Sequence, residues 1–496
     1  MKTCQERLLG KVAMTDTNRI EISGAGLRCA DVVRVARRSA STELGADAVR
    51  RAESSYQLAV ELGAKRAVYG RTTGVGANRH TVVDPESADH HGLRLLRSHA
   101  GGTGEPLPDD AVRAVMAIRL NQLAAGGSGV HPRLLEILQT ALRVGALPHV
   151  HSRGAIGTGD LAQLAEIALT LAGELPWAAG DLDPVAISPG DALAFISSNA
   201  AMLAEAVLAW HHLTRLLAAS HVVTALTFCA LGGSAEAYSE RVHASRPHPG
   251  AVRCAAEMRR LLTAGGDLPE GRRLQDPFGL RAFPQVQGPV LDAAANVERV
   301  LDIDVNAAAE NPLIDVETQE AYHHGQFSTA HVALAFDHLR AALHHTAELS
   351  TARLGDLVEP DLSGLPPFLA DGPPGSSGIM ILEYVAHDAL GTLRHAAAPV
   401  TLGTAVISRG LEDHASFSTH AVRSTVAATA AYRTILACEL LGAVRALRLA
   451  DADLPDTPLR EAFRLAAVGL PHVAEDHPLS AEIQQAERLL DHFAVL

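Results

Sequence analysis

The chain has 496 residues, a formal net charge of −14 at neutral pH, and 47% apolar but only 4% aromatic residues. This length allows a large core and more than one domain-sized unit. An acidic balance of this size disfavours nucleic acids and anionic membrane surfaces as partners. Because aromatic residues are so few, the core has to consist mainly of Ala, Leu and Val, which is typical of packed helices.

The cysteines are scattered along the chain, and no two of them have the CxxC spacing of a zinc or redox motif; they are Cys4, Cys29, Cys229, Cys254 and Cys438. This usage is typical of reduced thiols and predicts a cytoplasmic protein. The first ten residues, MKTCQERLLG, contain no apolar run of the signal-peptide type. The most apolar long stretch, about 200–233, includes charged and His side chains, so we expect a buried helix there and no membrane span.

In chain order, the first predicted element is a strand at Arg19–Ile22, where polar and apolar residues alternate before a Ser23-Gly24 turn. A region of short helical runs broken by Gly and Pro extends to about residue 195, and within it Asp160 is predicted to cap a helix. Longer runs with helical periodicity follow at about 200–231, 288–309, 328–357 and 420–451. The sequence therefore predicts an all-α fold, with a smaller, mixed but mainly helical N-terminal domain over 1–198. An elongated central bundle of long helices with a C-terminal helical cap is predicted over 199–496.

Common cofactor and metal motifs are absent from the sequence. Gly101-Gly102-Thr103-Gly104 lacks the Lys-Ser/Thr of a phosphate loop, and there is no HExxH. The paired histidines at 90/91, 211/212, 323/324 and 344/345 are adjacent, and adjacent helical residues point to different faces. His149 and His151 have the spacing of one strand face, but no third ligand accompanies them. We therefore predict no metal site.

Polar clusters at predicted loops and helix ends are the remaining candidates; they are Tyr69 to Gly76, Ser98-His99, Gln275 to Gly288, Asn306 with Asn311-Pro312, and Glu412-Asp413-His414. A tyrosine has an ordinary pKa of about 10, so Tyr69 needs a nearby cation or dipole to act as a base at neutral pH. Alternatively, it lies in a surface turn. Arg281 either binds a carboxylate through two hydrogen bonds or caps a helix.

Taken together, six segments resemble, in order, the motifs of the histidine/phenylalanine ammonia-lyase family. They are YGxxTGxG at Tyr69–Gly76, SHAxGxGEPL at Ser98–Leu107, QDPxxLRxxPQVxG at Gln275–Gly288, NxxxxNPL at Asn306–Leu313, PDLxGLPPFL at Pro360–Leu369 and EDH at Glu412–His414. The resemblance covers nearly the whole chain, and the Ser-His and Glu-Asp-His segments are most similar to the histidine lyases. It implies a helical homotetramer in which each active site takes residues from three subunits.

By position in these motifs, the resemblance implies a role for each candidate residue. Tyr69 would remove the β-proton of the substrate, and Arg281 would bind the substrate carboxylate. His99 and Glu412 would contact a polar substrate side chain such as imidazole. Five further residues would line the pocket: Ser197, Gln275, Phe278, Asn306 and Phe327.

The family's defining feature is an Ala-Ser-Gly triad that cyclises into methylidene-imidazolone (MIO), the electrophile that turns the substrate amine into a leaving group. Here the sequence has Gly157-Thr158-Gly159, in a loop one residue shorter. A cyclised Thr would give a hindered ethylidene, and a shorter loop alters the strained geometry that favours cyclisation. Phe278 stands where the family has a second catalytic tyrosine, and Asn199 is displaced by two residues from the position of the Asn that supports MIO. We therefore expect no standard MIO group and no other cofactor.

Three functions are compatible with these residues. The first is an enzyme of this family without MIO, in bacterial specialised metabolism. It would act on a small, carboxylate-bearing, amino acid-like substrate by base-promoted elimination, conjugate addition, isomerisation or cyclisation. The second is a conventional MIO-dependent histidine-type ammonia-lyase or aminomutase, and the third is a non-catalytic binding homologue. Retention of Tyr69, His99, Arg281 and Glu412 disfavours the third, and the altered triad favours the first.

Overall fold

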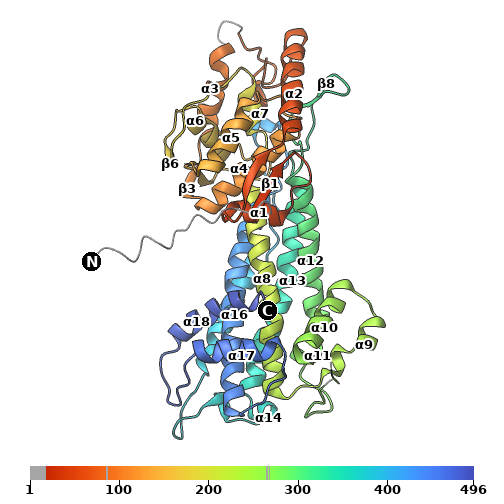
Figure 1. The fold of residues 1–496 in the computed structure, drawn as a ribbon, viewed down its shortest axis with the longest axis vertical. Coiled ribbons are helices and arrows are strands. Elements are labelled where there is room, and N and C mark those ends of the chain that lie inside the picture. Colours follow the sequence, from red (N-terminus) through yellow and green to blue (C-terminus); the bar gives the residue numbers. More distant parts are fainter. Residues whose placement is uncertain (1–17, 85–87, 264–265, 267–268) are drawn as a thin grey trace, which may run out of the picture. The chain divides into compact units, whose positions relative to one another are not determined.

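The computed structural model describes residues 18–84, 88–263, 266 and 269–496, so the N-terminal segment and Cys4 lie outside the described residues. The chain forms two compact units (Figure 1). Unit 1 comprises 1–207, 301–329 and 405–415, and unit 2 comprises 208–300, 330–404 and 416–496. The predicted division at residue 198 is close to the first boundary. It misses the two later segments of unit 1, because a boundary read along the chain does not show which connections between long helices return to the first unit.

Unit 1 is built around the helix α4 (Asp109–Ala124), which packs against α1 (Cys29–Ala36) and α5 (Arg133–Val144). Every residue of α4 from Ala111 onward is buried, as expected for a helix at the centre of a domain. The other helices of unit 1 are α2 (Ala46–Lys65), α3 (Ala88–His99), α6 (Leu161–Leu171), α7 (Asp191–Ile196) and the short 3₁₀ turns η2 (Gly76–Asn78) and η6 (Ser408–Gly410).

The strands of unit 1 form two-stranded pairs. The predicted strand β1 (Arg19–Ile22) is confirmed and pairs in parallel with β2 (Ser41–Leu44). The antiparallel pairs are β3 (Thr103–Pro106) with β5 (His151–Arg153), β4 (Leu147–Pro148) with β6 (Trp177–Ala179), and β7 (Leu313–Asp315) with β8 (Glu320–Tyr322). Only β1 is predicted from the sequence; the other strands of unit 1 have two to four residues and show no regular alternation of polar and apolar side chains.

Unit 2 consists of helices in the part that the structure describes. Its main layer is α13 (Ala330–Val358), which packs against α15 (Ile381–Ala396) and α16 (Ser418–Leu449). The others are η4 (Ala235–Tyr238), α9 (Glu240–Ala244), α10 (Pro249–Leu262), α11 (Phe278–Arg281), α14 (Pro360–Ser363), η5 (Pro367–Leu369), α17 (Pro458–Gly469) and α18 (Ser480–Phe493). The boundary between the units falls within α8 (Ala200–Leu231) and α12 (Phe283–Asp304).

The long helices confirm the predicted all-α fold. The helix α8 has the predicted bounds, whereas α12 begins at Phe283 and is shifted toward the N-terminus, because the buried Phe283 extends the apolar face ahead of Pro289. Apolar windows within Asp191–Leu231 and Ser418–Leu449 are long enough to cross a membrane, but 94% and 72% of them are buried inside the protein. Burial of this extent is typical of core helices.

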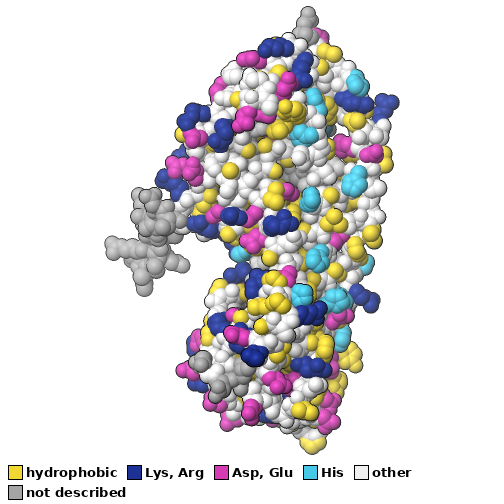
Figure 2. All heavy atoms as spheres, turned by 90° about the vertical axis from the view of Figure 1, so that its right-hand side faces the viewer, with side chains coloured by type: hydrophobic (Ala, Val, Ile, Leu, Met, Phe, Trp, Pro, Cys, Tyr) yellow, Lys and Arg dark blue, Asp and Glu magenta, His cyan; other side chains and the backbone are white. Residues whose placement is uncertain are grey.

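On the face shown in Figure 2, side chains of Lys and Arg are interspersed with those of Asp and Glu. No single sign of charge covers that face. A nucleic-acid footprint would require a continuous basic patch.

Candidate active site

A pocket of about 380 Å³ in unit 1 collects most of the residues predicted for the site. The lining residues come from separate segments of the chain and are Tyr69, Val75, Gly76, Ala77, Asn78, His99, Thr158, Gly159, Leu161, Leu193, Ser197, Asn311, Phe327, Ile407, Ser408 and Glu412. Among these described residues there is no Lys or Arg, and Glu412 is the one carboxylate. The lining therefore has one acidic side chain and no Lys or Arg, and Arg79, whose charge acts on Tyr69, lies outside it.

Tyr69 lies in the loop between α2 and η2, half-buried in the pocket wall. Its hydroxyl oxygen accepts a hydrogen bond of 2.7 Å from the backbone N–H of Gly76. Burial raises the pKa of Tyr69 above its usual value; the Gly76 N–H lowers it, the nearby Glu412 charge raises it and Arg79 lowers it, with a net rise. Tyr69 is therefore protonated at neutral pH, and a positive charge bound beside it would favour the phenolate form.

His323 is a neighbour of Tyr69 that sequence reasoning missed. The backbone N–H of Tyr69 points at Nε2 of His323 at 3.5 Å, and the two rings meet edge to face with centroids 6.4 Å apart. The only signal for His323 in the sequence is its adjacency to His324, a pattern that predicts no metal site.

His99 ends the helix α3 with its ring orientation fixed. Its Nδ1 lies 2.8 Å from the carbonyl oxygen of Leu95, which can only accept, so Nδ1 carries the proton of that hydrogen bond. In the neutral ring, this leaves Nε2 as an acceptor for a ligand in the pocket. The backbone of Glu412 forms an antiparallel bridge with that of Ile407. The Ile407 N–H donates to the Glu412 carbonyl at 2.8 Å, and the Glu412 N–H donates to the Ile407 carbonyl at 3.4 Å.

The Gly157-Thr158-Gly159 loop is anchored from both ends. The carbonyl oxygen of Gly157 accepts a hydrogen bond from Thr329 Oγ1 at 3.1 Å, and the N–H of Gly159 donates to Asn199 Oδ1 at 3.0 Å. Gly157 and Gly159 have φ values of +89° and +114°, which side chains other than glycine rarely adopt. Thr158 lies between them and contributes to the pocket wall.

Two expectations around this loop were wrong. Asp160 precedes α6, but its side chain does not cap that helix; its Oδ2 accepts from the N–H of Met202 at the start of α8, at 2.7 Å. Asn199 contacts the loop despite its displacement in sequence, and its Nδ2 also donates to the Phe327 carbonyl at 2.7 Å. Contacts with a distant segment decide both positions. Ser197, predicted for the pocket, lines it.

Asn306 does not line the pocket, contrary to the prediction. Its Oδ1 accepts from Leu27 N–H and from Asn121, and its Nδ2 donates to the carbonyls of Leu27 and Asp302 at 2.8 and 2.7 Å. These bonds use all the hydrogen-bonding groups of the amide to fasten the end of α12. Asn311 of the same motif lines the pocket instead.

Gln275, Phe278 and Arg281 belong to unit 2, whereas the pocket around Tyr69 is lined by unit 1 alone. The guanidinium of Arg281 lies 5.0 Å from the ring centre of Phe278, and its Nε donates to the Asp276 carbonyl at 3.0 Å. Phe278 is 60% exposed and lines a second pocket, of about 570 Å³, in unit 2. Gln275 and Arg281 are exposed as well, so all three are available to a ligand or to another subunit.

Adjacent histidines were predicted to point to different faces of a helix, but the side chains of His344 and His345 both approach one carboxylate. The Nδ1 atoms of His344 and His345 lie 3.6 and 3.3 Å from the same Glu348 carboxylate oxygen, and the three possible ligand atoms lie within 4.8 Å of one another. Helix-surface ion pairs at these spacings account for the arrangement without a metal. The group belongs to unit 2 and is not part of the Tyr69 pocket.

Comparison with known proteins identifies the family of the chain. The model of the aromatic amino acid lyase family matches residues 27–467. A histidine ammonia-lyase of Treponema denticola is 33% identical over 95% of this chain and 97% of its own. Among solved structures, an ergothionase of Treponema denticola, described as an ergothioneine-degrading enzyme, superposes with a TM-score of 0.91 and 26% identity, over 96% of this chain and 99% of the other. A tyrosine aminomutase of Streptomyces globisporus has a TM-score of 0.89 and 27% identity over 96% and 97%. The chain therefore belongs to the aromatic amino acid lyase family, whose ammonia-lyase-type enzymes act on amino acid-like substrates.

Proposed function

We propose that this chain is a lyase that works without MIO and eliminates a group that leaves without help from an electrophile. The observation that carries this proposal is Thr158 at the place of the family's serine. The anchors of the loop are present, because Asn199 and Thr329 hold its two glycines. What is missing is the hydroxymethyl group whose dehydration gives the methylidene.

A second feature of the loop opposes the usual triad. Gly157 has a φ of +89°, and an alanine there, as in the family's triad, would be strained. The residues at this position therefore do not fit MIO. Without MIO, an ordinary amino group is a poor leaving group, whereas a quaternary ammonium group departs as a neutral amine.

The composition of the pocket supports a cationic substrate group. Glu412 is the one carboxylate among the described lining residues, no Lys or Arg accompanies it, and Tyr69 and Phe327 supply aromatic surface. A carboxylate and aromatic rings are the groups that bind quaternary ammonium ions. The substrate class is therefore an α-trimethylammonio acid with an imidazole-type side chain, and ergothioneine, which the similar ergothionase degrades, is the first compound to test.

In this reaction, the phenolate oxygen of Tyr69 removes a proton from the β-carbon of the substrate. The electrons of that C–H bond form the Cα=Cβ double bond, the Cα–N bond breaks, and trimethylamine leaves with its electron pair. Burial raises the pKa of Tyr69, and the bound cation lowers it again, so the base is activated by the substrate itself. Glu412 faces the ammonium group of the substrate, and His99 binds its ring.

Arg281 binds the carboxylate of the substrate in this proposal. Because Arg281 belongs to unit 2 and no Arg lines the described pocket, we assign this role to Arg281 of a neighbouring subunit in a homotetramer. We further propose a cytoplasmic enzyme of bacterial specialised metabolism.

Two measurements on the purified chain test the proposal. Peptide mapping across residues 153–165 is expected to give the unmodified mass, and incubation with ergothioneine is expected to release trimethylamine. Loss of the mass of two water molecules in that peptide, with ammonia released from histidine, would overturn it in favour of a MIO-dependent lyase. An unmodified peptide and no turnover of any trimethylammonio acid would overturn this substrate class, and would leave a MIO-less enzyme with a different substrate or the binding homologue.

A conventional MIO-dependent histidine lyase is the second candidate, since the loop anchors and the 33% identity to a histidine ammonia-lyase favour it. The variant Thr158→Ala separates the two candidates. It removes the residue that would form the electrophile, so a MIO-dependent enzyme loses its activity almost completely. In the enzyme proposed here, the change alters one wall contact and lowers activity by less than about tenfold.

A further inference from the structure

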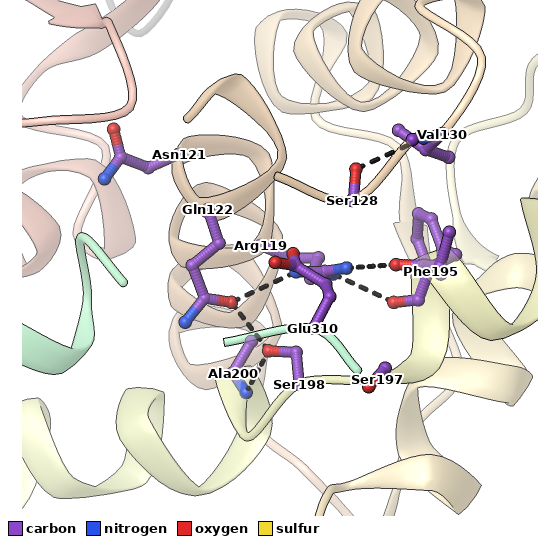
Figure 3. A network of polar contacts seen from close by, with 12 residues as sticks. Arg119, Asn121, Gln122, Ser128, Val130, Phe195, Ser197, Ser198, Ala200 and Glu310 are labelled. Atoms are coloured by element: carbon purple, nitrogen blue, oxygen red, sulfur yellow. Dashed lines mark hydrogen bonds and ion pairs between the residues drawn. The ribbon is translucent and has the colours of Figure 1, made fainter. Parts of the chain in front are cut away.

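The pocket of unit 1 rests on a buried ion pair that no sequence motif indicated. Arg119 of α4 contacts Glu310 at 2.7 Å between Nη1 and Oε1, and both side chains are only 1% exposed (Figure 3). The two residues are 191 positions apart in sequence. Both belong to unit 1.

The guanidinium of Arg119 also holds the end of α7. Its Nε donates to the Phe195 carbonyl at 2.8 Å and its Nη2 to the Ala194 carbonyl at 2.5 Å (Figure 3). Its Nη1 donates to Gln122 Oε1 at 3.3 Å, and the same oxygen accepts from Ser198 Oγ at 2.6 Å. One buried side chain thus fixes the segment from 194 to 198.

From that segment, one further step reaches the loop in the pocket. The carbonyl of Ser198 accepts from Asp160 N–H at 2.7 Å, and Asn199 Oδ1 accepts from Gly159 N–H at 3.0 Å. The position of the Gly157–Gly159 loop therefore depends on where Arg119 places residues 194–198.

Glu310 connects the same guanidinium to the facing wall. It directly precedes Asn311, which lines the pocket and whose N–H donates to Ser197 Oγ at 3.1 Å. Arg119 therefore contacts both the segment that carries the loop and the segment that carries Asn311.

The pair is costly to keep. Glu310 Oε2 is buried without a hydrogen-bond partner among the described residues, and burial raises the pKa of Glu310 against the opposing effect of Arg119. Apolar residues of similar size often replace buried ion pairs without loss of stability. Stability alone therefore does not account for this pair, whereas the contacts of the two residues connect two segments of the pocket wall.

We propose that Arg119 and Glu310 are positioning residues that set the separation between the Gly157–Gly159 loop and Asn311. Only the catalytic consequence of this inference rests on the proposed function; the structural consequence does not depend on it.

Hydrogen exchange of the full chain, followed by mass spectrometry, tests the inference. The double variant Arg119→Met/Glu310→Met removes both charges and leaves no unpaired buried ion. We expect amides in 153–165 and 194–200 to exchange at least about tenfold faster, while β1 and the helices of unit 2 keep wild-type rates. Unchanged exchange at both segments, or a uniform increase throughout unit 1, would overturn the inference.

A matched control is available in unit 2. Arg340 is a second fully buried arginine that pairs with Asp337 and donates to the carbonyls of Ala396 and Ala421. The variant Arg340→Met/Asp337→Leu should accelerate exchange in unit 2 and leave 153–165 unaffected; acceleration of 153–165 in this control would contradict a specific role for Arg119. If the first double variant does not fold, Gln122→Leu is the second variant. It removes the acceptor of Ser198 Oγ and of Arg119 Nη1, together with the hydrogen bond from Gln122 Nε2 to the Asp304 carbonyl, and it has to accelerate exchange in 153–165.

Activity toward ergothioneine gives an independent readout. In the double variant we expect kcat to fall at least about tenfold while KM changes less than threefold, because the loop and Asn311 are displaced relative to each other. A change in KM alone would contradict positioning of the reacting groups. If the wild-type chain has no turnover, the proposed function fails, and hydrogen exchange still decides whether the pair positions the loop.

Discussion

The variant Tyr69→Phe tests the assigned base most directly, because it removes a single oxygen. That oxygen has two functions that are expected to differ in size. It accepts the hydrogen bond from Gly76 N–H at 2.7 Å, and it is the atom proposed to take the β-proton. The variant keeps the ring, its edge-to-face contact with His323 and the shape of the pocket.

The cost to stability is expected to be small. Gly76 is only half-buried, so water can replace the lost acceptor, and the free energy of unfolding should fall by about 1 kcal/mol. The cost to catalysis is expected to be large, since general-base catalysis contributes roughly 10²- to 10⁴-fold. That range corresponds to about 3 to 5 kcal/mol in the activation free energy. The stability effect cannot account for it.

The assay is release of trimethylamine from ergothioneine, with the unfolding temperature of each variant measured in parallel. Tyr56→Phe in α2 is the matched control, because it makes the same chemical change in unit 1 at a residue that does not line the pocket. We expect activity close to wild type in the control and a loss of at least about 100-fold in Tyr69→Phe. Activity of Tyr69→Phe within tenfold of wild type would show that another group removes the proton.

Three further outcomes are expected. Glu412→Gln removes a negative charge that raises the pKa of Tyr69. The pH at which kcat/KM rises should therefore be lower in the variant, while the maximum of kcat/KM falls. A rise at the same or a higher pH would contradict the effect of Glu412 on Tyr69. Thr158→Ser restores the family's middle residue but not the missing loop residue, and intact mass should show no loss of two waters; such a loss would mean that Thr158 alone prevents cyclisation. Glu310→Gln leaves the Arg119 charge buried and uncompensated. The free energy of unfolding, measured by chemical denaturation, should therefore fall by about 3 to 5 kcal/mol. A fall of less than about 1 kcal/mol would show that the buried site tolerates the Arg119 charge without its partner.

Much of the fold is encoded locally and could be predicted. The long apolar runs give α8, α13 and α16 nearly at their predicted bounds, because helical periodicity depends on residues three and four positions apart. The order of the motifs also indicated the family and the residues Tyr69, His99, Phe327 and Glu412, all of which line one pocket.

What the sequence by itself determined is the chemistry present in the chain: a tyrosine, a histidine and a glutamate for the pocket, and a threonine where the family has serine. Only the tertiary structure decided which asparagine side chains lie at the pocket and its loop. The side chain of Asn306 is hydrogen-bonded to Leu27 and Asp302, whereas that of Asn199 is hydrogen-bonded to Gly159 despite its displacement in sequence. The buried pair of Arg119 and Glu310 has no local signal either, since it joins residues 191 positions apart. Such contacts depend on the angles at which helices and turns bring distant segments together, and no short sequence window contains that information.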